Sequence, residues 1–142
     1  MIVAYCDSSI LLARMLDEPG SQKADEVVSG LCESGAVLVT SHLSTVEVRR
    51  TLARVLNVAA DQPEVAQKAR AVLGGVHTLD VTAEVLHIAG ALPVILLRAL
   101  DAVHVASALL SEANVVVTHD RQMARACSEL GLAVACARRA RR

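Results

Sequence analysis

The stretch IVAYCDSSILLARMLDEPG, residues 2–20, decides the fold class of this chain. It opens with an apolar, β-branched run at residues 2–6, which is typical of a buried strand. After Asp7 it continues into an apolar segment of helical character that stops at Pro19 and Gly20. A strand followed at once by a helix is the repeating unit of parallel α/β sheets. A chain that repeats this unit has strands that all end at one edge of the sheet.

The same alternation continues along the chain. Further β-branched runs lie at residues 36–40, 76–81 and 115–118, with a fifth candidate at 132–136. Segments of helical character separate them, at residues 21–35, 41–57, 63–75, 82–92, 97–110 and 120–131. Such alternation predicts an α/β fold with a mostly parallel central β-sheet of four to five strands flanked by helices. We expect a single domain at residues 1–137 and a basic C-terminal tail at residues 138–142.

The composition is that of a folded chain with little net charge. At 142 residues the chain suits one hydrophobic core. It is 54% hydrophobic, with one Tyr and no Phe or Trp, so the core must consist of Ala, Val, Leu and Ile. The four cysteines form no C-x-x-C pair, which argues against zinc. The sequence has no basic leader and no apolar run long enough to span a membrane, so we expect a cytoplasmic protein without a membrane partner.

Two of the predicted strands end in an acid that a helix follows at once. Asp7 comes after residues 2–6, and Asp120 comes two residues after the strand at 115–118. Ligands of open parallel sheets bind beyond the carboxyl ends of the strands, so these two acids are expected to lie near each other. Each of them also suits the N-cap of the helix that follows. The pattern alone leaves both interpretations open.

Two further acids lie on predicted helices. An ordinary surface ion pair with Arg50 would explain Glu47. Asp101 is harder to explain, because the segment 97–110 is apolar on nearly every side and a buried carboxylate needs a charged partner, hydrogen bonds or a metal. Arg98 is one such partner. Crowded carboxylates repel one another, so the four acids together favour a hard divalent cation such as Mg²⁺.

In this order along the chain, these residues resemble the PIN-domain ribonucleases, and among them the VapC-type toxins of type II toxin–antitoxin systems. The resemblance rests on four pieces: Asp7 with Ser9 two residues on, Glu47 in STVEVRRTL, Asp101 in RALDAVHVASAL, and Thr118-His119-Asp120 after VVV. It implies that Asp7, Glu47, Asp101 and Asp120 hold Mg²⁺ or Mn²⁺ and catalyse RNA hydrolysis by metal-activated water. It also implies that the hydroxyls of Ser9 and Thr118 orient ligands or water, with helix capping as the alternative.

The resemblance also implies the partners of the protein. They are a structured cellular RNA (tRNA, rRNA or mRNA), a cognate antitoxin protein and a second copy of the chain in a homodimer. Tyr5 is the only aromatic residue on which a base could stack, so we expect RNA to be held through phosphates by Arg49, Arg50 and Arg54. Since imidazole is an uncommon Mg²⁺ ligand, we expect His104 and His119 to be structural residues with satisfied hydrogen bonds.

Two other functions remain open at this stage. One is a PIN-like binding module without catalysis, against which the intact set of acids argues. The other is a phosphatase or receiver-type domain that forms an aspartyl phosphate on Asp7. Such proteins need a lysine near the phosphoryl group, and the only lysines here, Lys23 and Lys68, do not follow a strand.

Overall fold

The computed structural model describes residues 1–136, so the predicted basic tail at residues 138–142 lies outside the described residues. The centre of the fold is a five-stranded sheet in which every neighbouring pair of strands is parallel. The strands follow the order β3 (His77–Leu79), β2 (Val37–Ser41), β1 (Val3–Cys6), β4 (Val115–Thr118) and β5 (Val134–Cys136). The predicted α/β class with a parallel sheet is confirmed, and the fifth candidate strand is present.

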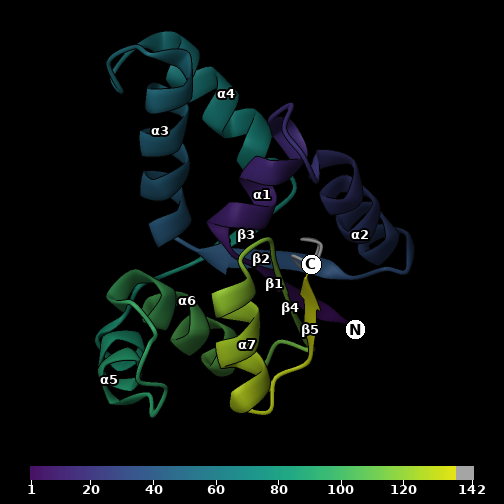
Figure 1. Ribbon diagram of the computed structural model, residues 1–142, viewed down its shortest axis with the longest axis vertical. Coiled ribbons are helices and arrows are strands. Elements are labelled where there is room, and N and C mark those ends of the chain that lie inside the picture. The colour runs from purple at the N-terminus through teal and green to yellow at the C-terminus, as the bar shows by residue number, and fades with distance from the viewer. Residues whose placement is uncertain (137–142) are drawn as a thin grey trace.

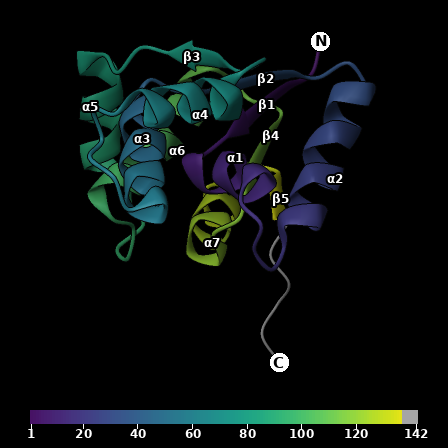
Figure 2. The same cartoon turned by 90° about the horizontal axis from the view of Figure 1, so that it is seen from above.

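Helices cover both faces of this sheet (Figure 1). One face carries α1 (Ser8–Met15), α2 (Ser21–Glu33), α3 (Leu43–Leu56) and α4 (Pro63–Leu73), and the other carries α5 (Ala83–Ala91), α6 (Ala99–Leu110) and α7 (Arg121–Glu129). Figure 2 shows the same layers from above. A separate hydrophobic cluster lies on each face, one around Ile10 and Val48 and the other around Val105 and Val116. The central strands β2, β1 and β4 are therefore largely buried between two layers of helices, whereas the edge strand β3 is mostly exposed.

The core consists mainly of Ala, Val, Leu and Ile, as the composition predicts, and Tyr5 and Met123 are its largest additions. Cys6, Cys32 and Cys127 are free thiols. Within residues 1–136, no helix has the length and apolar character needed to cross a membrane.

The order in which the strands are added reverses at one position of the sheet, between β1 and β4. From β1 the chain winds outward to β2 and β3, and it then returns to form β4 on the other side of β1. Ligand crevices of such sheets open at this reversal, beyond the carboxyl ends of the two strands. The amide of Asp7, just after β1, donates to the carbonyl of Val117 in β4 (3.3 Å), which joins the two strand ends. Asp7 and Thr118 therefore meet at the reversal.

Helix α6 begins later than the sequence predicts. Its first residue is Ala99 and Arg98 is its N-cap, so Asp101 lies in the first turn and not in the middle of a helix at 97–110. The partial positive charge of a helix N-terminus favours an acid there. Leu100, next to Asp101, is half exposed, so this end of α6 is not buried on every side. Because residues 97–110 are apolar on nearly every side, the sequence did not indicate that the first turn of α6 is exposed.

Candidate active site at the carboxyl edge of the sheet

Asp7 is the most deeply buried acid of the site, with 4% of its surface exposed. Its Oδ1 accepts hydrogen bonds from the Ser9 hydroxyl (2.7 Å) and the Ile10 amide (3.1 Å), and its Oδ2 accepts one from the Thr118 hydroxyl (2.6 Å). Burial raises the pKa of Asp7, and these three hydrogen bonds only partly oppose the effect. Asp7 is thus both the N-cap of α1 and a carboxylate whose ionised form is destabilised by burial. Of the two interpretations left open by the sequence, the helix cap is confirmed for Asp7, and its place in a ligand site stays a prediction.

Glu47 projects from α3 towards α1 and α6. Its Oε1 lies 2.6 Å from His104 Nε2 and accepts a hydrogen bond from the Ser8 hydroxyl at 3.2 Å. No ion pair joins Glu47 to Arg50 in the part of the chain that the structure describes. The ordinary surface pair considered for Glu47 is therefore absent, and a histidine takes its place.

Asp101 and Asp120 complete the set of acids. Asp120 caps α7 through Oδ1, which accepts from the amides of Gln122 (2.8 Å) and Met123 (3.2 Å). Asp101 is half-buried, and neither an ion pair with Arg98 nor any hydrogen bond to its carboxylate occurs among residues 1–136. The pKa of Asp101 is raised by burial first, then by the charge of Asp120, with Asp7 and Glu47 adding to the effect. Repulsion of this kind means that the four carboxylates share one electrostatic environment.

We call Asp7, Glu47, Asp101 and Asp120 the acidic site. Its donors are all hard oxygens, and none of them pairs with a described Lys or Arg, which is the chemistry that Mg²⁺ prefers. Yet no three His, Cys, Asp or Glu side chains in the described chain are placed to bind one ion together. A magnesium ion held by one or two carboxylates, with water completing its shell, fits this arrangement.

The supporting hydroxyls Ser9 and Thr118 form one network around Asp7. Their Oγ atoms lie 3.3 Å apart, Ser9 accepts from the amide of His119 (3.0 Å), and Thr118 accepts from the amide of Asp120 (3.0 Å). The two hydroxyls thus orient the Asp7 carboxylate and connect it to the loop that leads into α7. Helix capping, the alternative role, belongs to Asp7 and Asp120 themselves.

The sequence did not indicate that His104, the histidine on α6, contacts an acid of the site. His104 is 1% exposed, and besides Glu47 it contacts the Tyr5 hydroxyl through Nδ1 at 2.6 Å. Burial raises the pKa of Tyr5 far above its ordinary value. Spacing could have revealed both residues, because His104 is three positions after Asp101 on a helix and Tyr5 is two before Asp7 on a strand. For His119 the expectation of satisfied hydrogen bonds is wrong, since its buried Nδ1 has no partner among the described residues.

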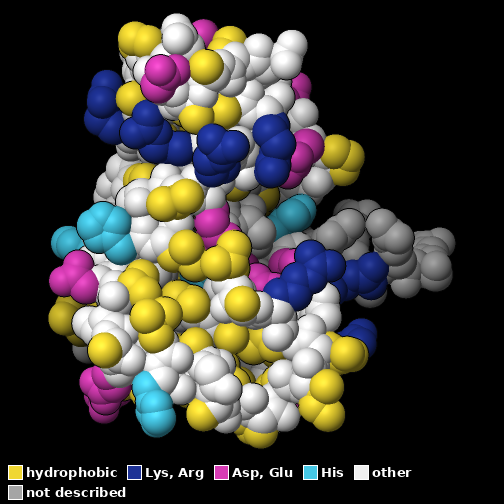
Figure 3. Space-filling model, turned by 90° about the vertical axis from the view of Figure 1, so that its left-hand side faces the viewer, with side chains coloured by type: hydrophobic (Ala, Val, Ile, Leu, Met, Phe, Trp, Pro, Cys, Tyr) yellow, Lys and Arg dark blue, Asp and Glu magenta, His cyan; other side chains and the backbone are white. Residues whose placement is uncertain are grey.

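The predicted RNA-binding arginines lie on α3, and all three are exposed. Arg49 donates to the carbonyl of Ala60 (2.9 Å), and Arg54 donates to the Thr51 hydroxyl (3.3 Å). Figure 3 shows basic side chains in a band over α3 and α4, with acidic side chains below the band and an apolar patch lower still. The basic band thus borders an acidic region on the same face of the molecule.

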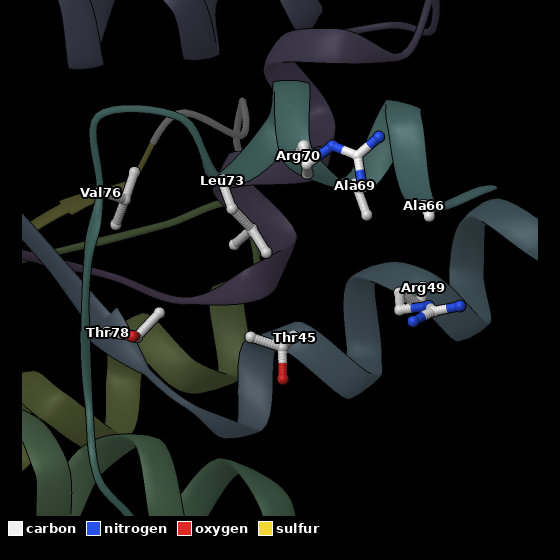
Figure 4. Close-up of a pocket in the computed structure, with 8 residues that line it drawn as sticks. All are labelled: Thr45, Arg49, Ala66, Ala69, Arg70, Leu73, Val76 and Thr78. Atoms are coloured by element: carbon white, nitrogen blue, oxygen red, sulfur yellow. The ribbon is translucent and has the colours of Figure 1, made fainter. Parts of the chain in front are cut away.

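A hollow of about 430 Å³ lies between α3 and α4 (Figure 4). Its lining residues are Thr45, Arg49, Ala66, Ala69, Arg70, Leu73, Val76 and Thr78. Thr45 and Arg49 are each two residues from Glu47, so they point to the opposite side of α3. The hollow is therefore separate from the acidic site.

Comparison with known proteins agrees with this geometry. The sequence profile of the PIN domain family matches residues 4–129. The chain belongs to the PIN domain family, and within it to the VapC-type ribonucleases. Among its relatives is Ribonuclease VapC47 of Mycobacterium tuberculosis, which is 31% identical over 133 residues that cover 92% of this chain and 94% of the relative.

Solved structures share the fold at lower identity. A VapBC2 structure from Rickettsia felis, bound to a DNA fragment from their promoter, has a TM-score of 0.71 and 13% identity, and covers 95% of this chain and 98% of that one. VapC20 of Mycobacterium tuberculosis, described as a Sarcin-Ricin loop cleaving toxin, has a TM-score of 0.67 and 18% identity, with 91% and 95% covered. At these identities the likeness concerns the fold alone.

Proposed function

We propose that this protein is a divalent-metal-dependent endoribonuclease and the toxin of a toxin–antitoxin pair. The observation that carries the proposal is the acidic site: four carboxylates at the reversal of the sheet, without a Lys or Arg partner among the described residues. Burial raises the pKa of Asp7, and burial together with the charges of Asp120, Asp7 and Glu47 raises the pKa of Asp101. Free energy is therefore gained when a cation enters, which supports Mg²⁺ or Mn²⁺ as the cofactor.

The residues of the chain have separate tasks in this mechanism. Bound Mg²⁺ or Mn²⁺ would activate a water molecule and neutralise charge on the scissile phosphate. Asp7, fixed by Ser9 and Thr118, provides the rigid ligand. Asp101 offers both oxygens, which accept no hydrogen bond from the rest of the described chain. Asp120 offers Oδ2, because its Oδ1 is held by the N-terminus of α7. No side-chain nucleophile is required.

We propose that RNA is held mainly through its phosphates. Arg49, Arg50 and Arg54 are exposed on α3, the helix that also carries Glu47. Tyr5 is fully buried, so it offers no ring to a base. Binding of this kind follows the shape and charge of the RNA, which favours a structured RNA as the substrate. The name of VapC20, a toxin that cleaves the Sarcin-Ricin loop, is consistent with such a substrate.

The proposed partners follow from the same family. A cognate antitoxin is supported by the likeness of the fold to a VapBC2 complex. We further propose a homodimer, and the apolar patch in Figure 3 supports a contact surface on that face. We further propose that the protein acts in the cytoplasm, where its proposed RNA substrate is found.

The competing functions are disfavoured for separate reasons. An aspartyl phosphate on Asp7 requires a lysine near the phosphoryl group, but Lys23 lies within α2 and Lys68 within α4, so neither follows a strand. A binding module without catalysis has no need for carboxylates whose ionised forms are destabilised by burial. The RNA cleavage assay decides between the proposed nuclease and a binding module without catalysis.

The test is RNA cleavage by the purified chain, freed of any partner. We expect cleavage with Mg²⁺ or Mn²⁺, none with EDTA, and none in Asp101→Asn with Mg²⁺. The matched control is Asp61→Asn, which makes the same change at an exposed acid outside the acidic site and should leave cleavage intact. Cleavage in EDTA, or full activity in Asp101→Asn, would show that the proposal is wrong.

A further inference from the structure

We propose that Tyr5 and His104 are positioning residues that hold one oxygen of Glu47 and leave the other free to act. The three residues form a chain of hydrogen bonds, which we call the buried relay, from β1 through α6 to α3. The role given to the free oxygen rests on the proposed function. The relay itself rests on contacts within the protein.

The direction of the relay is assigned from its first bond. The backbone amide of Ser41 lies 3.1 Å from the Tyr5 hydroxyl, and an amide N–H can only donate. The phenol oxygen therefore accepts from Ser41, and its own proton is available for another contact. We assign that proton to His104 Nδ1, at 2.6 Å, with the imidazole neutral and Nδ1 as the acceptor.

The remaining bond follows from the chemistry of imidazole. A neutral imidazole without a proton on Nδ1 carries it on Nε2. His104 Nε2 lies 2.6 Å from Glu47 Oε1, so it donates to that oxygen. The Ser8 hydroxyl donates to the same oxygen at 3.2 Å. Oε1 thus has two donors, whereas Oε2 of Glu47 accepts no hydrogen bond within residues 1–136.

Packing makes the relay rigid. Tyr5 is 0% exposed and His104 is 1% exposed, and their rings meet edge to face with centroids 5.9 Å apart. Rotation of either ring would leave a buried polar group without a partner, which is costly. Glu47, by contrast, is only partly buried on a helix with an exposed face, so its side chain would be mobile without the relay. The relay ends on a member of the acidic site, which distinguishes it from hydrogen bonding that serves the core alone.

The test measures Mn²⁺ affinity by electron paramagnetic resonance on protein stripped of metal. Partners that orient metal ligands typically change affinity by roughly 10- to 100-fold when removed. We expect His104→Leu, which loses the donor to Glu47, to weaken Mn²⁺ binding by at least about tenfold. His104→Gln retains an N–H near the position of Nε2 and should bind within about threefold of the wild type. Tyr5→Phe removes only the hydroxyl and should also weaken binding.

A second readout does not depend on metal. In protein with ¹⁵N-labelled histidine, NMR should show His104 protonated on Nε2 and bare on Nδ1. In Tyr5→Phe the proton should stay on Nε2, where Glu47 accepts it, while the Nδ1 resonance shifts because Nδ1 has lost its hydrogen-bond donor. Equal Mn²⁺ affinity in the wild type, His104→Leu and Tyr5→Phe would overturn the proposal, as would a proton on Nδ1 of the wild type. If His104→Leu fails to fold, Tyr5→Phe and the NMR measurement decide. If the wild type binds no Mn²⁺, the proposed function is wrong. The tautomer of His104 in that protein still decides whether the relay exists.

Discussion

Replacing the buried acid Asp7 by asparagine should stabilise the metal-free protein while abolishing RNA cleavage. Asparagine keeps an oxygen for the Ser9 hydroxyl and the Ile10 amide, and its own amide can donate to Thr118 Oγ1. The N-cap of α1 is also retained, because asparagine caps helices as well as aspartate does. The substitution therefore removes the buried charge and little else.

The direction follows from the raised pKa of Asp7, since burial outweighs the three hydrogen bonds that favour its ionised form. The desolvation penalty of a buried polar group is typically about 1 to 3 kcal/mol, so we expect Asp7→Asn to raise the free energy of unfolding at pH 7 by about that amount. For a domain of this size the melting temperature should rise by several degrees.

The sign of the pH dependence can be tested as well. As the pH falls towards and below the ordinary pKa of 3.8, Asp7 becomes protonated in both states and resembles asparagine, so the two proteins should approach equal stability. Between the ordinary pKa of 3.8 and the raised pKa, the unfolded wild type has lost its proton and the folded one retains it. Wild-type stability therefore falls relative to Asp7→Asn as the pH rises through this window, and the difference is constant above it.

The assay is urea unfolding in EDTA at pH values from 4 to 8, with cleavage measured in parallel with Mg²⁺. A variant that is less stable than the wild type at pH 7, or a stability difference that does not change with pH, would refute the reasoning about Asp7. A variant that still cleaves RNA would refute its place in the acidic site.

Three further predictions concern the surroundings of the site. Thr118→Val leaves Asp7 Oδ2 without its hydroxyl donor and should cost about 1 to 3 kcal/mol in urea unfolding, so an unchanged midpoint would contradict this contact. Arg50→Glu combined with Arg54→Glu should raise KM for RNA with little change in kcat and reduce the dependence of binding on salt; an unaltered salt dependence would exclude these arginines from binding. Leu11→Ala, at a position 1% exposed, should lower stability by about 2 to 5 kcal/mol without changing the Mn²⁺ affinity of the folded protein.

The sequence was sufficient to predict the fold because its signals are local. The β-branched runs are short, a helix follows each of the first four, and parallel pairing follows from that alternation. Asp7 and Asp120 could be assigned to one edge of the sheet for the same reason. The start of α6 was missed because the apolar residues before Ala99 continue the helical pattern, and only the exposure of Leu100 in the fold reveals where the helix begins.

The partners of the acids were harder to predict. The contact from His104 to Glu47 joins residues 57 positions apart, and the contact from Tyr5 to His104 joins residues 99 positions apart. No periodicity connects residues at such distances, so the imidazole looked like an ordinary core residue. The choice between an Arg50 pair and another partner for Glu47 likewise depended on which side of α3 faces α6. Tertiary packing decides these points, and the local sequence does not.

The central claim is that the acidic site binds a divalent cation, and anomalous diffraction from crystals grown with Mn²⁺ tests it most directly. The account predicts an anomalous peak about 2.1 Å from a carboxylate oxygen of Asp7 or Asp101, with water completing the coordination. The free oxygen of Glu47 should lie towards the peak, and the peak should be absent from Asp101→Asn crystals grown in the same way. A well-ordered structure without a peak at these carboxylates, at a Mn²⁺ concentration that supports RNA cleavage, would contradict the account.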